Sequence, residues 1–167
     1  MKKPLSKCIV TGILFVAIAG TLAHFLYEWT GKNILVGLIT PINEAVWEHI
    51  KLLFFPTLLF TAYAARCFRE DCPHIGYALC RGNLLGCLLI PTLYYTYTGA
   101  LGMHFSAADI AIFFLCVLTT FLHAGHLIRT GQAEKHRLLT VLCTSLLAAA
   151  IFAFTLFPPA VPLFISP

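Results

Sequence analysis

Two segments of the chain place imidazole and carboxylate side chains at spacings that suit a shared site. In the first, His24 and Glu28 are four residues apart and therefore share one face of a helix. The second lies ahead of a long apolar stretch and holds five polar residues: Asn43, Glu44, Glu48, His49 and Lys51. Imidazole nitrogens and carboxylate oxygens bind divalent metals, and inside membranes such groups also bind polar head groups or relay protons.

A helix that continues through the second segment would carry Glu44, Glu48 and Lys51 in one narrow stripe. Glu48 and Lys51 can then form an ion pair, which lowers the cost of placing both charges at depth. Packing this stripe against His24 and Glu28 would create a compact polar site. The narrowest hypothesis is a divalent-metal site formed by His24, Glu28 and Glu48. The broader hypothesis is a site for a small polar solute, an ion or a lipid head group.

An interfacial position is the alternative explanation for the second segment. A helix over residues 41–68 would be about 42 Å long, which exceeds the roughly 30 Å of a bilayer core. Its first turns would then stand among the lipid head groups. There the negative charge of Glu44 would interact favourably with the helix N-terminus. Trp47 would be an interfacial aromatic residue, and Lys51 would extend its ammonium toward water. Both explanations remain open at this point.

A second polar face follows the apolar stretch at residues 107–129. It carries six polar side chains within one arc of a helix: Asp109, Cys116, Thr119, Thr120, His123 and His126. A comparable face precedes it in the sequence, with Asn83, Cys87, Tyr94 and Thr98. Two such faces can line a path for a proton or a solute across a membrane. They can equally serve as hydrogen-bonding contacts between helices, with the two histidines near an interface.

The composition indicates what kind of elements must hold these residues. Of the 167 residues, 59% are hydrophobic and only 11% are charged, whereas soluble domains carry about 25% charged residues. So little charge cannot coat a water-soluble globule. The same balance excludes a disordered chain, a coiled coil and a disulfide-rich secreted scaffold.

We predict an all-α fold: a five-span transmembrane helical bundle forming one integral membrane domain over residues 1–167. Five apolar stretches have the roughly 20 residues that a helix needs to cross a bilayer. They are Cys8–Trp29, Asn43–Phe68, Ile75–Thr98, Ala107–Arg129 and Leu138–Phe157. The first stretch resembles a signal peptide, but we expect it to be retained, because the apolar run continues past the cleavage-like residues 17–19.

The segment between the first two spans is expected to be interfacial or re-entrant. Its apolar run, Ile34–Ile39, is far too short to cross a bilayer. Thr40 and Pro41 then resemble a helix N-cap followed by a first helical residue, which predicts that the second span begins at Pro41.

Basic residues predict the orientation of the bundle. Eight of the eleven Lys and Arg residues fall before the first span, between the second and third, or between the fourth and fifth: Lys2, Lys3, Lys7, Arg66, Arg69, Arg129, Lys135 and Arg137. The opposite loops hold only Lys32. By the positive-inside rule, the N-terminus is cytoplasmic and the C-terminus external, in a bacterial cytoplasmic membrane. The net charge of +4 is thus a topology signal and gives no reason to expect nucleic acid as a partner; the expected partner is the lipid bilayer.

Four of the seven acidic residues then lie toward the external ends of their spans: Glu28, Glu44, Glu48 and Asp109. Because an ionised side chain costs about 2.5–3.5 kcal/mol at mid-bilayer on insertion scales, we expect these acids to face one another or a wet cavity. This clustering predicts that the polar site opens outward.

The sequence also resembles a known family. Residues 41–52, with the pattern Asn-Glu-x-Val-Trp-Glu-His-x-Lys-Leu, resemble an uncharacterised family of small bacterial integral membrane proteins, a domain of unknown function. Its members share a His-Phe-x-Tyr-Glu-Trp stretch, which matches residues 24–29, and a proline-rich ending similar to residues 158–164. They carry a histidine in that ending where this chain has Ala160 and Val161, so we expect no metal ligand from the tail. The resemblance implies a helical membrane protein and brings no activity.

Three classes of function therefore remain open. A binding or transport protein predicts a water-accessible cavity that continues along the fourth span to His123. A metal-dependent hydrolase for an amphiphilic substrate predicts that His24, Glu28 and Glu48 converge on one ion with an open coordination position. An accessory or structural subunit predicts neither, with interfacial charges directed into solvent.

Overall fold

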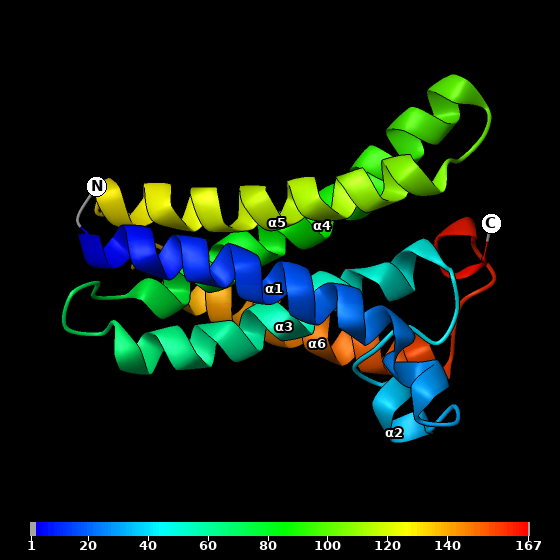
Figure 1. Ribbon diagram of the computed structural model, residues 1–167, viewed down its shortest axis with the longest axis horizontal. Coiled ribbons are helices and arrows are strands. Elements are labelled where there is room, and N and C mark those ends of the chain that lie inside the picture. Colours follow the sequence, from blue (N-terminus) through cyan, green and yellow to red (C-terminus); the bar gives the residue numbers. More distant parts are fainter. Residues whose placement is uncertain (1–2, 167) are drawn as a thin grey trace.

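A computed structural model describes residues 3–166, with the side chains of residues 5–166. It contains five long helices: α1 (Lys3–Trp29), α3 (Val46–Cys67), α4 (Ile75–Leu101), α5 (Ser106–Arg129) and α6 (Arg137–Leu156). A single helical turn, α2 (Ile34–Gly37), and a 3-10 turn, η1 (Pro162–Phe164), complete the elements (Figure 1). Residues 3–166 contain no strand, so the predicted all-α fold is confirmed.

Five helices are long and apolar enough to cross a membrane. They contain 20 to 27 residues, and 20 helical residues span about 30 Å, the thickness of a hydrocarbon core. Large apolar side chains cover their outer faces; Leu14 is 58% exposed and Leu146 is 68% exposed. Such faces suit lipid rather than water. The expected number of candidate spans is confirmed, and the direction in which they cross stays a prediction.

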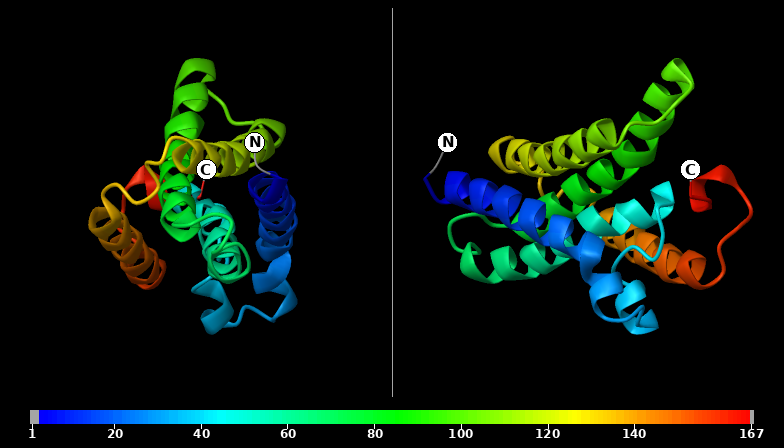
Figure 2. Two further views of the ribbon diagram at one scale, coloured as in Figure 1. Left: turned by 90° about the vertical axis from the view of Figure 1, so that its left-hand side faces the viewer. Right: turned by 45° about the vertical axis from the view of Figure 1, so that its right-hand side comes forward.

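Consecutive long helices run in opposite directions along the bundle (Figure 1). One end holds the start of α1 and the loops at residues 68–74 and 130–136; we call it the basic end, because it carries Lys7, Arg66, Arg69, Lys135 and Arg137. The opposite end holds residues 30–45, the turn at residues 102–105 and the C-terminal segment. Viewed along the bundle, α3 lies between α1 and α6, and α4 and α5 cover another side (Figure 2).

Glycines set the closest helix contacts. A Cβ atom at Gly82 of α4 would lie 2.2 Å from the carbonyl oxygen of Thr120 on α5, and one at Gly86 would lie 2.2 Å from the Thr120 hydroxyl. Gly20 allows an equally close contact between α1 and α3, because a Cβ atom there would lie 2.6 Å from the carbonyl oxygen of Leu52 on α3. Small residues let helix backbones approach without a hydrophobic driving force. Gly20 thereby brings the second half of α1 against the start of α3.

The predicted start of the second span is wrong. Helix α3 begins at Val46, and residues 41–45 form a loop. The Asn43 side chain accepts a 2.9 Å hydrogen bond from the Ala45 N–H, and Glu48 accepts one of 2.9 Å from the Ile42 N–H. These bonds satisfy backbone donors in a non-helical conformation. Thr40 does not act as a cap, since its hydroxyl donates to the Val36 carbonyl.

The loop changes the register of the polar residues. Because Glu44 precedes α3, it does not share a helical stripe with Glu48 and Lys51, as a continuous helix would require. The short segment between the first two spans is folded as α2, where Asn33 accepts a hydrogen bond from Leu35 N–H and caps the turn.

Candidate functional site

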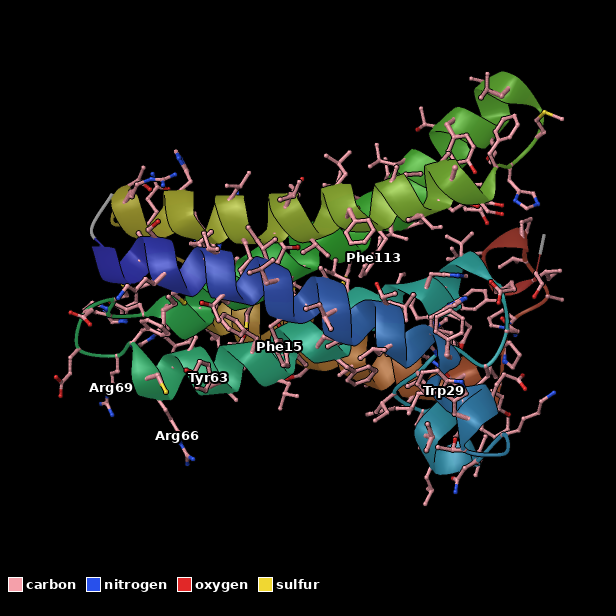
Figure 3. The ribbon with its side chains drawn as sticks, in the orientation of Figure 1. Phe15, Trp29, Tyr63, Arg66, Arg69 and Phe113 are labelled. Atoms are coloured by element: carbon pink, nitrogen blue, oxygen red, sulfur yellow. The ribbon has the colours of Figure 1, made fainter. Side chains whose placement is uncertain are left out.

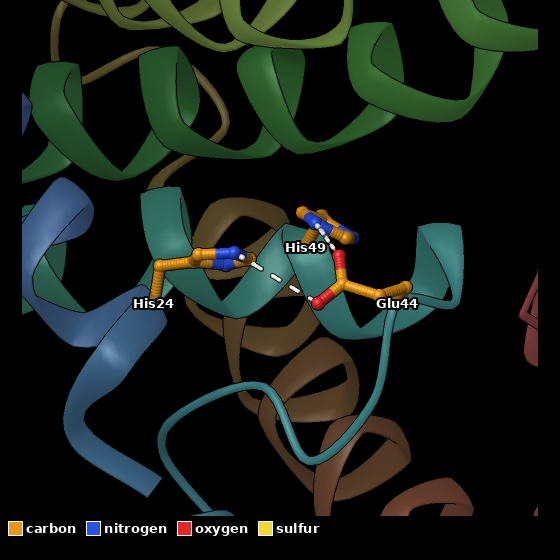
Figure 4. A group of neighbouring side chains, drawn as sticks. All are labelled: His24, Glu44 and His49. Atoms are coloured by element: carbon orange, nitrogen blue, oxygen red, sulfur yellow. Dashed lines mark ion pairs between the residues drawn. The ribbon is translucent and has the colours of Figure 1, made fainter. Parts of the chain in front are cut away.

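Three side chains from three segments meet near the end of the bundle that lies opposite the basic end (Figure 4). His24 comes from α1, Glu44 from the loop before α3, and His49 from the first turn of α3. His24 Nε2 lies 3.9 Å from Glu44 Oε1, and His49 Nε2 lies 3.4 Å from Glu44 Oε2. One ligand atom from each residue lies within 4.8 Å of the other two. We call these residues the His–Glu–His group.

Local structure explains how the group forms. The close contact at Gly20 holds α1 against α3, and His24 follows Gly20 by one helical turn. The Asn43 side chain accepts a hydrogen bond from the Ala45 N–H and holds the loop before α3 in a turn. Glu44 is therefore not part of the helix, and its side chain faces back toward α3. The rings of His24 and His49 then lie 5.5 Å apart between centroids and are inclined by 34°.

The hydrogen bond of His49 determines which ring nitrogen is available. His49 Nδ1 lies 3.0 Å from the Ala45 carbonyl oxygen, and a carbonyl only accepts, so Nδ1 carries the hydrogen. In the neutral ring, Nε2 therefore keeps its lone pair and faces Glu44. Metal-binding histidines commonly donate their other ring N–H to a backbone carbonyl, which fixes the tautomer in this way.

The environment of His24 differs. Its Nδ1 is buried and has no hydrogen-bond partner among the described residues, while its Nε2 faces Glu44. A buried ring nitrogen without a partner requires an explanation, such as a water molecule or an ion. The two histidine side chains are each 31% exposed and Glu44 is 67% exposed, so the group is accessible from the Glu44 side.

The three ligand atoms lie close to the spacing that a tetrahedral metal requires, but not at it. Two ligand atoms at zinc-binding distances of about 2.1 Å are roughly 3.4 Å apart in tetrahedral geometry. The 3.4 Å distance from His49 runs to Oε2 of Glu44, and the 3.9 Å distance from His24 runs to Oε1. One carboxylate oxygen can therefore serve both imidazoles at tetrahedral spacing only after the side chains move from their present separation of up to 4.8 Å. Two imidazoles and one carboxylate also form the ligand set of several catalytic zinc sites, in which the fourth position stays open. Without a metal, Glu44 can share a proton with either ring.

Lys51, one of the sequence-predicted site residues, has a structural role instead. Its side chain is completely buried, and its ammonium donates to Glu48 Oε2 at 2.6 Å, to the Gly37 carbonyl at 2.8 Å and to the Thr40 carbonyl at 3.3 Å. An ammonium has three donors, and all three are used. The predicted Glu48–Lys51 pair is confirmed. It attaches the α2 segment to α3.

Glu48 and Glu28 do not join His24. Glu48 is 3% exposed; its Oε2 atom accepts from Lys51 and from the Ile42 N–H, and its Oε1 atom lies 3.4 Å from the Thr155 hydroxyl on α6. Glu28 is 66% exposed and lies 3.5 Å from the Lys32 ammonium. Of the three predicted metal ligands, the structure therefore brings only His24 into the observed group.

Comparison with known protein families assigns the chain to one of them. The model of a family of unknown function, DUF6512, matches residues 1–166. The chain belongs to this family. The match covers nearly the whole sequence and agrees with the resemblance to an uncharacterised family, but it assigns no activity. We found no similar protein among curated proteins or among solved structures.

In this family member, Asp109 lies in a separate cluster at the turn between α4 and α5. The Tyr97 hydroxyl donates to Asp109 Oδ1 and accepts a 3.2 Å hydrogen bond from the Phe105 N–H. His104 Nδ1 lies 3.6 Å from Asp109 Oδ2. Tyr97 and His104 were not predicted as site residues, because no single-helix spacing connects them to Asp109. The cluster closes the turn.

The remaining polar residues of α5 do not meet Asp109. His123 and His126 lie near the opposite end of the helix, with His123 half-buried and His126 exposed. Between them and Asp109, Thr120 is buried in the glycine contact with α4. Asn83 of α4 donates a 3.1 Å hydrogen bond to the Phe54 carbonyl on α3. The middle of the expected polar path is therefore a packed helix contact.

Proposed function

We propose that this protein binds a divalent transition-metal cation of the zinc type at the His–Glu–His group. The observation that carries the proposal is the placement of one ligand atom each from His24, Glu44 and His49 within 4.8 Å of one another. These residues come from three separate segments, so their approach is a product of the fold rather than of helical spacing.

The electronic state of the ligands supports this proposal. The Ala45 carbonyl holds His49 in the tautomer whose Nε2 is free to coordinate. Glu44 offers two oxygens, which face the two imidazoles. Its exposure leaves room for a water molecule or an external ligand at a fourth position.

The other functions suggested by the sequence receive less support. Hydrolysis would require a general base beside the metal. Glu48 does not suit this role, because its carboxylate already accepts hydrogen bonds from Lys51 and from the Ile42 N–H. Transport along α5 would require a polar path through the contact at Thr120. Metal binding requires neither condition. Under the orientation that the basic residues predict, the group lies on the external side of a bacterial cytoplasmic membrane.

Metal analysis of the purified protein tests the proposal. The protein is prepared with an affinity tag that binds no metal, loaded with Zn²⁺, and desalted. We expect about one zinc ion per chain in the wild type. The His24→Ala and His49→Ala variants should each lose most of it. His74→Ala is the matched control, because His74 also pairs with a glutamate, Glu134 at 3.4 Å, but at the basic end.

Two results would overturn the proposal. One is a wild-type protein that retains no zinc after loading. The other is zinc retention in His24→Ala and His49→Ala equal to that of His74→Ala. Thermal unfolding of each variant is measured alongside, so that loss of metal is distinguished from loss of fold.

A further inference from the structure

An apolar groove lies on the outer surface of the bundle between α1 and α3. It has a volume of about 340 Å³ and is lined by Thr11, Phe15, Leu59, Phe60 and Tyr63. This volume falls within the range of roughly 300–1,000 Å³ that is typical of small-molecule sites. The groove lies toward the basic end, far along α3 from the His–Glu–His group, and is independent of the proposed metal site (Figure 3).

Packed aromatic rings form the floor of the groove. Phe60 is 3% exposed, and its ring lies 5.5 Å from that of Phe121 and 5.9 Å from that of Phe15. Gly12 leaves room for this arrangement, because a Cβ atom there would lie 2.1 Å from Phe121 and 2.7 Å from Phe60. The hollow is thus fixed by the core.

The walls of the groove are open to the surroundings. Leu59 is 65% exposed, Tyr63 is 52% exposed and Phe15 is 37% exposed. On a helix that faces lipid, such a hollow is the size and polarity of a site for an acyl chain.

Basic side chains continue both walls toward the end of the bundle. Lys7 precedes Thr11 by one turn of α1, and Arg66 follows Tyr63 by three residues on α3. These steps correspond to about 6 Å and about 4.5 Å along the helices. Both side chains are exposed, and neither forms an ion pair within the described part of the chain. Figure 3 shows Tyr63, Arg66 and Arg69 in succession at this end of α3, with the Arg66 side chain directed away from α1. Because Arg66 is exposed, its long side chain can rotate toward the groove.

The charged residues near the groove indicate what kind of molecule binds in it. The acidic residues at this end lie in the loops at residues 68–74 and 130–136 and not on the helix faces beside the groove: Glu70, Asp71 and Glu134. An uncharged amphiphile would gain no electrostatic attraction from the two exposed cations. Basic residues next to an apolar groove between helices suit an anionic lipid head group.

We propose that this groove binds an anionic phospholipid. One acyl chain lies against Phe15, Leu59 and Phe60, and the phosphate is held by Lys7 and Arg66. The Tyr63 ring separates the apolar part of the site from the charged part. The lipid would thereby be bound at one defined position rather than as part of a general annulus.

Native mass spectrometry of the protein in a neutral detergent tests the proposal. The protein is titrated with phosphatidylglycerol and, separately, with phosphatidylcholine of the same chain length. We expect selective binding of one phosphatidylglycerol. A basic residue near an anionic lipid contributes roughly fivefold to affinity, so Lys7→Gln combined with Arg66→Gln should lower the affinity by roughly 25-fold. Leu59→Trp, which fills the groove, should weaken binding without a change of charge.

The control variant combines Lys135→Gln with Arg137→Gln. It removes the same charge from the same end of the bundle, away from the groove. An equal loss of affinity in both double variants would show diffuse attraction and overturn the proposal, as would unchanged binding in Leu59→Trp. A separate arm adds millimolar inorganic phosphate, which we expect not to displace the lipid; displacement by phosphate alone would overturn the acyl-chain contact.

Discussion

Lys51 and Glu48 form an ion pair of 2.6 Å in the interior of the bundle, where the lysine side chain has no exposed surface. The same ammonium donates to the carbonyl of Gly37, the last residue of α2, and to the carbonyl of Thr40. A charged pair that sequence spacing suggests as part of a binding site is therefore a connection between α3 and the preceding segment. Its loss affects the fold before it affects any ligand.

The Lys51→Met variant should be strongly destabilised. Removing one partner of a buried ion pair costs about 3–5 kcal/mol, because the other charge stays buried without compensation. Lys32→Met is the matched control, since Lys32 forms an exposed pair with Glu28 and such pairs contribute about 0–1 kcal/mol. Thermal unfolding in detergent compares the two. Equal losses of stability would contradict the structural role of Lys51.

Glu44→Gln and Glu48→Gln should separate metal binding from stability. Glu44 faces both imidazoles, so its amide variant should bind zinc at least 10-fold more weakly, as loss of a zinc ligand requires. Glu48→Gln should lower the unfolding temperature and leave zinc affinity within about twofold in the folded protein. Zinc titration and thermal unfolding of both proteins check this. The opposite assignment would restore the ligand set expected from the sequence.

Zinc affinity should decrease as the pH falls. Coordination requires neutral imidazoles, and protons compete with the metal for the same nitrogen lone pairs. Because two histidines coordinate, zinc affinity should be lower at about pH 5.5 than at about pH 7.5. Zinc titrations across this range test the expectation. In the His74→Ala variant the profile should be the same, because His74 lies outside the group.

The orientation of the bundle can be tested with single cysteines. In a variant in which the native cysteines are replaced, Met103→Cys reports on the α4–α5 turn and Gln132→Cys on the loop between α5 and α6; both positions are exposed. A membrane-impermeant maleimide applied to whole cells should label position 103, and position 132 only after the membrane is opened. The reverse pattern would place the His–Glu–His group on the cytoplasmic side.

Much of the fold is predictable from local composition. The five long helices follow from apolar runs of about 20 residues, because in lipid a chain must satisfy its backbone hydrogen bonds within each segment. The Glu48–Lys51 pair follows from helical spacing alone. The beginning of α3 does not, because side-chain bonds from Asn43 and Glu48 hold the loop at residues 41–45 out of the helix.

For the candidate site too, the sequence predicts one part and the fold decides the other. The sequence determined that His24, Glu44 and His49 lie near one end of their spans, because apolar stretches and helix lengths fix depth. Only the tertiary structure decided that these three residues meet and that Glu28 and Glu48 stay outside the group. The reason is physical: the approach of α1 to α3 at Gly20 and the turn at Asn43 are contacts between distant or non-helical residues. Helical periodicity carries no information about either.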